Sequence, residues 1–241
     1  MGKVKNQMES KLLVAIPSPR DIKEVTENWT TYDYDCIVVK YALQHEAYKH
    51  LREYFLEHEE YTHFCIMPDD LVVTSEQLND LWECATIEDN YPVLSGICPV
   101  DEDETRPKGI PLAIQRVIPK QTRDSDETRS PRDWVYQKDL YPCDSIIKVE
   151  HAGFPCMIIR RDIMEIVSWR GSTKIGLNLE GNYDWQFSQD CKRNGIPIHV
   201  MPYVYLKHLR NTQSKEAKEN PKNKSAFFYF INNDSQTTSI P

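Results

Sequence analysis

The chain has no long apolar segment and no excess of basic residues. Its apolar run from Leu12 to Ile16 is far too short for a membrane span or for the hydrophobic part of a signal peptide, and the stretch up to Ser10 is polar. Lys and Arg number 29 against 37 Asp and Glu, which gives a formal net charge of -8. This charge argues against general attraction to nucleic acid or to anionic lipid. We therefore expect no transmembrane segment and no nucleic-acid partner.

The cysteines lack any C-x-x-C pair, and their number, 7, is odd. Most of them lie singly in apolar runs, which is typical of reduced thiols in a protein core. We therefore expect a reducing, cytoplasmic compartment.

The composition is that of an ordinary globular protein. Hydrophobic residues make up 40% and charged residues 27%, which excludes a fibrous or wholly disordered chain. A length of 241 residues favours one substantial domain with loop insertions over two independent cores. We predict a tail at 1–10, a main domain at 11–210 with a mobile, charge-rich insertion at 101–135, and a C-terminal extension at 211–241.

Apolar runs typical of buried strands alternate with helical patterns through the first hundred residues, and no internal repeat is present. Strands are expected at 12–16, 36–41, 64–67 and 91–97. One helix is expected after residue 43, and another after the capping box that Thr74 and Gln77 form. The alternation predicts an α/β fold with a mixed, mostly parallel central sheet and helices on both faces. In such folds ligands bind at the carboxyl ends of the strands.

Three segments follow predicted strands and are therefore candidates for a site: Pro17-Ser18-Pro19-Arg20, Pro68-Asp69-Asp70, and the residues after Leu206, which include His208. Two adjacent carboxylates supply oxygen ligands that suit Mg²⁺ or Mn²⁺. Aspartate is also common in a solvated turn before a helix, so the pair by itself leaves both interpretations open.

Four segments, in order along 11–210, resemble nucleotide-sugar-dependent glycosyltransferases of the GT-A fold, of the family 2 type. The segment 63–73 is similar to the strand that ends in the family's D-x-D metal motif, although Pro68 stands at the first acidic position. The segment 91–96 is similar to the strand after the D-x-D helix, and 152–161 to a glycine-containing segment that lines the donor sugar and the acceptor. The segment 183–187, followed by 192–198, resembles the acidic helix start that supplies the general base in inverting members.

The resemblance implies a role for each candidate residue. Asp70 and His208 are expected to hold Mn²⁺ or Mg²⁺, and Asp184 to act as the catalytic base, with Glu180 as the fallback. Residues expected to bind the nucleotide-sugar donor are Pro17, Ser18, Arg20, Asp69 and Gly153. The acceptor is expected to be a hydroxyl of a glycan or another molecule. Other roles of these residues stay open. Arg20 could be a solvated side chain, Gly153 a turn residue and His208 a polar residue at a strand end. Asp184 could only favour the positive end of its helix.

A metal ion has a physical reason to be present in such a site. The departing nucleoside diphosphate carries negative charge. At an effective dielectric near 20, a carboxylate about 4 Å away repels each unit of this charge with an energy of about 4 kcal/mol. A divalent cation reverses the sign of this interaction.

Two rival functions remain. A sugar-phosphate nucleotidyltransferase would carry a glycine-rich loop where this chain has Pro17 to Arg20, and a degenerate nucleotide-sugar-binding module is suggested by Pro68.

Overall fold

The computed structural model describes residues 10–20, 22–87, 91–100, 111–115, 134–140, 145–173, 180–181, 183–209, 227–231 and 237–240. Most of the predicted tail, of the predicted insertion at 101–135 and of the segment 210–226 lies outside these ranges. The first half of the chain forms β1 (Leu12–Ser18), α1 (Lys23–Trp29), β2 (Asp35–Lys40), α2 (Gln44–Glu57), β3 (His63–Ile66), β4 (Leu71–Val72), α3 (Ser75–Ile87), β5 (Val93–Ile97) and β6 (Pro111–Gln115).

The second half contains shorter elements. They are β7 (Trp134–Tyr136), α4 (Gln137–Leu140), β8 (Ile147–Val149), β9 (His151–Ala152), β10 (Met157–Arg160), α5 (Arg161–Ile166), β11 (Ser172–Thr173), β12 (Glu180–Gly181), α6 (Tyr183–Arg193), β13 (Ile198–Tyr205), β14 (Lys207–His208), β15 (Phe227–Ile231) and β16 (Thr237–Ile240).

The predicted capping box at the start of α3 is confirmed. The backbone N–H of Gln77 donates to Thr74 Oγ1 at 3.2 Å, and the Thr74 N–H donates to Gln77 Oε1 at 3.0 Å. Two backbone donors that the helix leaves open at its start are thereby satisfied.

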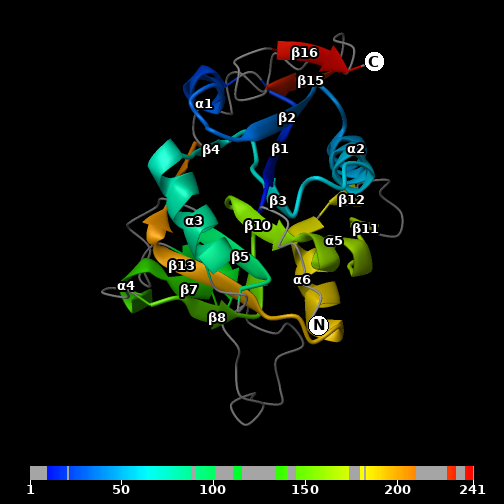
Figure 1. The fold of residues 1–241 in the computed structure, drawn as a ribbon. Helices are drawn as coiled ribbons and strands as arrows, with labels where there is room; N and C mark the ends of the chain where they lie inside the picture. Colours follow the sequence, from blue (N-terminus) through cyan, green and yellow to red (C-terminus); the bar gives the residue numbers. More distant parts are fainter. Residues whose placement is uncertain are drawn as a thin grey trace, which may run out of the picture.

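The central sheet has nine described strands in the order β16-β15-β2-β1-β3-β10-β5-β13-β8 (Figure 1). Its neighbours are parallel at β1–β2, β1–β3 and β5–β13. The other five neighbouring pairs are antiparallel. The sheet is therefore mixed, as predicted, but the prediction that it is mostly parallel is wrong. Parallel neighbours require a crossover connection, which the strand–helix alternation of the first hundred residues supplies for β1, β2 and β3. Of the strands from later segments, β13 is parallel to β5, whereas β8, β10, β15 and β16 pair only antiparallel in this sheet.

Helices cover both faces of this sheet (Figure 1). β1 is buried along its whole length, and its side chains alternate between two apolar clusters. Ala15 belongs to the cluster that contains Leu51 of α2, together with residues of α5 and α6. Val14 belongs to the cluster that contains Leu81 of α3, together with residues of α1. Within the described ranges, no helix is both long and apolar enough to cross a bilayer.

Candidate functional site

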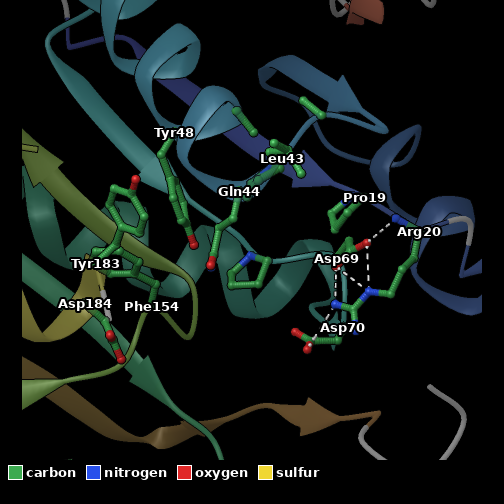
Figure 2. A pocket seen from close by; sticks show the side chains of 14 residues that line it. Pro19, Arg20, Leu43, Gln44, Tyr48, Asp69, Asp70, Phe154, Tyr183 and Asp184 are labelled. Atoms are coloured by element: carbon green, nitrogen blue, oxygen red, sulfur yellow. Dashed lines mark hydrogen bonds and ion pairs between the residues drawn. The ribbon is translucent and has the colours of Figure 1, made fainter. Parts of the chain in front are cut away.

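The carboxyl ends of β1 and β3 bring the first two candidate segments together. Ala15 of β1 is in register with Ile66 of β3, so the loops that follow leave the sheet side by side. Arg20 lies across the acidic pair (Figure 2): its backbone N–H donates to Asp69 Oδ2 at 3.0 Å, and its Nε lies 3.2 and 3.3 Å from the two Asp69 oxygens. An Arg20 terminal nitrogen also bonds Asp69, and it lies 3.2 Å from Asp70 Oδ2. Arg20 is therefore an ion-pair partner of both carboxylates.

His208 reaches Asp70 through a second pairing, between β14 and β4. His208 is in register with Leu71, and the N–H of Leu209 donates to the Asp70 carbonyl oxygen at 2.8 Å. This places His208 Nε2 3.4 Å from Asp70 Oδ2. The other ring nitrogen, Nδ1, lies 3.0 Å from the carbonyl oxygen of Pro99. Because a carbonyl oxygen only accepts, Nδ1 carries a proton, and Nε2 is the ring nitrogen that faces the Asp70 carboxylate: it donates a hydrogen bond there when it carries a proton and offers a lone pair when it does not.

The environment affects the two carboxyl groups differently. Burial would raise the pKa of Asp70, but the hydrogen bond with His208 and the charge of Arg20 outweigh it and hold this pKa at about 2. Burial raises the pKa of Asp69 above its usual value of 3.8, although Arg20 opposes the shift. Asp70 is consequently ionised at every physiological pH, and its charge faces both Arg20 and His208.

A pocket of about 590 Å³ joins the acidic pair to Asp184. Figure 2 shows Asp184 on one side of this pocket and Arg20, Asp69 and Asp70 on the other. The lining residues are Pro17, Pro19, Arg20, Ala42, Leu43, Gln44, Ala47, Tyr48, Pro68, Asp69, Asp70, Phe154, Tyr183 and Asp184. These described lining residues carry three carboxylates and one guanidinium, so the pocket wall has an excess of negative charge.

Asp184 lies in the first turn of α6 with its carboxylate toward the pocket. Its Oδ1 accepts a hydrogen bond from the N–H of Trp185 at 2.8 Å, and its Oδ2 lies 3.8 Å from Nε2 of the buried His151. Ser188 donates its hydroxyl to the Asp184 carbonyl oxygen at 2.8 Å and lies 3.0 Å from His151 Nδ1. Since the single Ser188 proton is used in this way, His151 Nδ1 carries the proton of the bond to Ser188, and Nε2 is the ring nitrogen that faces Asp184.

Gly153 lies near this carboxylate and packs closely against Ala113. A Cβ atom on Gly153 would lie 3.3 Å from the Ala113 Cβ and 3.8 Å from Asp184 Oδ2. Gly153 is not among the residues that line the pocket, and neither is Ser18. Ser18 is fully buried, and its hydroxyl donates to the Arg20 carbonyl oxygen at 2.7 Å. This hydrogen bond stabilises the conformation of the loop that carries Arg20.

The structure thus brings together most of the residues selected from the sequence. One pocket is lined by Pro17, Arg20, Asp69, Asp70 and Asp184. His208 does not line the pocket, but its Nε2 lies 3.4 Å from Asp70 Oδ2. The side chain of Glu180, the fallback base, is not described.

The contribution of α2 to the pocket was not predicted from the sequence. Gln44 and Tyr48 of this helix line the pocket between the acidic pair and Asp184 (Figure 2). Burial raises the pKa of Tyr48, and the charges of Asp184, Asp70 and Asp69 raise it further against an opposing hydrogen bond with Gln44. The charges of all three carboxylates therefore act on the hydroxyl of Tyr48. The spacing in the sequence does indicate this role. Tyr48 lies three residues before Leu51 and seven before Phe55, so a helix places its hydroxyl on the buried face.

The residues present fit a divalent cation only in part. Within the described ranges, no three His, Cys, Asp or Glu side chains are grouped so that they could hold a metal. Asp70 and His208 supply two donor atoms, Oδ2 and Nε2, which lie 3.4 Å apart and could both face one cation. Mg²⁺ is commonly bound by one or two carboxylates while ligand phosphates and water complete its shell. The pair therefore fits a cation that a phosphate ligand helps to hold.

Comparison with known proteins adds evidence on the fold. No model of a known protein family matches the chain, and no curated protein sequence matches it. A solved structure described as "Crystal Structure of A197 from STIV" superposes with a TM-score of 0.53 at 14% sequence identity, over 96% of this chain and 94% of that chain. At this identity the similarity shows a shared α/β fold alone.

Proposed function

We propose that the protein is a GT-A-type glycosyltransferase that moves a sugar from a nucleotide-sugar donor to a hydroxyl of a glycan or another acceptor, assisted by Mn²⁺ or Mg²⁺. The observation that carries the proposal is the pocket in which Asp70, backed by His208, lies across from Asp184 (Figure 2). A mixed sheet covered by helices on both faces is compatible with the GT-A fold. The pocket volume of about 590 Å³ is in the usual range for small-molecule sites.

The charge of the pocket supports the requirement for a metal. Three carboxylates against one guanidinium leave the described wall with a net charge of about -2, which repels a diphosphate. On this proposal Asp70 and His208 hold the cation. When bound, it stabilises the negative charge that develops on the departing diphosphate. Arg20 adds a positive charge on the same side of the pocket.

On this proposal, Asp184 acts on the acceptor. In the proposed reaction the bond between the anomeric carbon and the diphosphate oxygen breaks, and a bond forms between that carbon and the acceptor oxygen. The acceptor proton goes to the Asp184 carboxylate. Because Asp184 lies across the pocket from Asp70, attack from the side opposite the leaving group is favoured, which corresponds to inversion.

The protein works, on this proposal, in the reducing cytoplasm, since the six described cysteines are free thiols.

One observation favours a second candidate, the degenerate nucleotide-sugar-binding module. Both Asp69 oxygens bond Arg20, so in this arrangement Asp69 adds nothing to a metal site. A binding module would bind a nucleotide sugar without turning it over. The nucleotidyltransferase alternative has no such support, because the loop from Pro17 to Arg20 lacks glycine.

Release of nucleoside diphosphate from a panel of nucleotide sugars tests the proposal. We expect release in Mn²⁺, none in EDTA, and recovery when Mn²⁺ is restored. Asp70→Asn should lower release at least about tenfold, because it removes the ionised metal donor. The matched control is Asp80→Asn, at an exposed position of α3, which should leave release unchanged. Binding of a donor without release would support the binding module, and failure to bind any donor with Mn²⁺ would refute both functions.

A further inference from the structure

Arg20 occupies the position that a cation at the acidic pair would need. Its guanidinium bonds Asp69 and lies 3.2 Å from Asp70 Oδ2, the same oxygen that lies 3.4 Å from His208 Nε2. We propose that Arg20 is a movable internal counter-ion that couples two binding events: its guanidinium leaves Asp70 when a divalent cation binds, and it then binds the diphosphate of the nucleotide. This inference rests on the proposed function and concerns how the same site is filled.

Competition follows from the geometry of one oxygen atom. A cation held by Asp70 and His208 must approach Asp70 Oδ2, which already faces the positive charge of Arg20. Two positive groups at one carboxylate oxygen repel each other, so the cation binds poorly while the guanidinium stays in place. Arg20 therefore lowers the affinity for the metal ion alone.

The side chain of Arg20 can leave without breaking the loop. Asp69 is almost fully buried, but it would keep the hydrogen bond from the Arg20 backbone N–H at 3.0 Å. The Arg20 carbonyl oxygen is held by the Ser18 hydroxyl at 2.7 Å. The guanidinium is the more accessible partner, with 22% of the Arg20 side chain exposed against 3% for Asp69. Only the side chain has to move.

A diphosphate would give the displaced guanidinium a new partner. Arg20 supplies the positive charge among the described residues that line the pocket, and a guanidinium matches phosphate oxygens in a bidentate geometry. The diphosphate thereby lowers the cost of displacing Arg20, and metal and diphosphate each raise the affinity for the other. Such coupling between two ligands is reciprocal and typically changes affinity by about 5- to 150-fold.

The test measures binding and needs no turnover. Free Mn²⁺ is followed by electron paramagnetic resonance during titration of the protein, first with Mn²⁺ alone and then with inorganic pyrophosphate, whose own complex with Mn²⁺ is subtracted. The variant is Arg20→Gln, whose amide can still donate to Asp69 without the charge. Arg193→Gln is the matched control: it removes one positive charge from the exposed end of α6, away from the pocket.

In the unaltered protein, we expect pyrophosphate to tighten Mn²⁺ binding at least about tenfold. Arg20→Gln should bind Mn²⁺ alone about tenfold more tightly than the unaltered protein, and pyrophosphate should then change that affinity by no more than about threefold. Arg193→Gln should behave like the unaltered protein. If Arg20→Gln does not fold, as its thermal unfolding would show, Arg20→Lys replaces it and should shift both affinities in the same directions by smaller factors.

The inference is overturned if removal of the guanidinium leaves the affinity for Mn²⁺ alone unchanged or weakens it. That result leaves the proposed function standing, provided that the unaltered protein binds Mn²⁺ and pyrophosphate. If the unaltered protein binds neither, the proposed function fails together with the inference.

Discussion

Replacing Asp184 with asparagine should remove the base and leave the site otherwise intact. The substitution conserves shape. The Asn oxygen can still accept from the Trp185 N–H, the bond that is 2.8 Å long in the structure. The amide group then faces His151 Nε2, which lies 3.8 Å from the present carboxylate oxygen. We therefore expect the free energy of unfolding to change by less than about 0.5 kcal/mol.

The catalytic effect should be much larger. Loss of a general base typically lowers the rate by about 10²- to 10⁴-fold, which corresponds to about 2.7 to 5.4 kcal/mol in the activation free energy. Donor binding should be nearly unchanged, because Asp184 lies across the pocket from Asp70 and Arg20 (Figure 2). The signature of Asp184→Asn is thus a reduced kcat with an unaltered Kd for the nucleoside diphosphate in Mn²⁺.

The assay combines initial rates of nucleoside diphosphate release with calorimetric titration of the nucleotide. Asp162→Asn is the matched control, since Asp162 is also in the first turn of a helix but is absent from the pocket lining. A kcat for Asp184→Asn within about threefold of the unaltered protein would refute the role of the base. A loss of nucleotide affinity of more than about tenfold would show instead that Asp184 binds the donor.

Two further predictions concern stability. Gly96→Ala would place a Cβ 3.1 Å from Leu206 Cδ1, between β5 and β13, so urea denaturation should show a loss of about 1 to 3 kcal/mol; an unchanged midpoint would contradict this packing. Burial would raise the pKa of Asp190, but a hydrogen bond from Ser168 and two nearby arginines lower it below 3.8. Its ionised form therefore stabilises the fold above pH 3.8, and this contribution is lost as the pH falls through the lowered folded-state pKa. Asp190→Asn should cost about 1.5 to 3 kcal/mol at pH 7 and progressively less below pH 3.8, and a pH-independent difference would refute this.

Local patterns predicted the core of the fold. The apolar run from Leu12 is β1, buried on both faces, and the pair Thr74 and Gln77 caps α3 through two hydrogen bonds. Both features depend on residues that are near one another in the chain, so periodicity and capping chemistry are sufficient to find them. The prediction of a mostly parallel sheet was wrong, because β8 and β10 are short strands of the second half whose antiparallel pairing depends on distant segments.

The sequence by itself determined that acidic and basic groups would follow the ends of β1 and β3, because an apolar strand must end where polar residues begin. Only the tertiary structure decided how those groups meet: the pairing of β14 with β4 brings His208 to Asp70, and α2 inserts Tyr48 between Asp70 and Asp184. The same holds for Arg20, whose ion pair with both carboxylates no local pattern encodes. The physical reason is that propensity and periodicity act over a few residues, whereas the register between strands distant in the chain is set by packing and hydrogen bonding of the whole sheet.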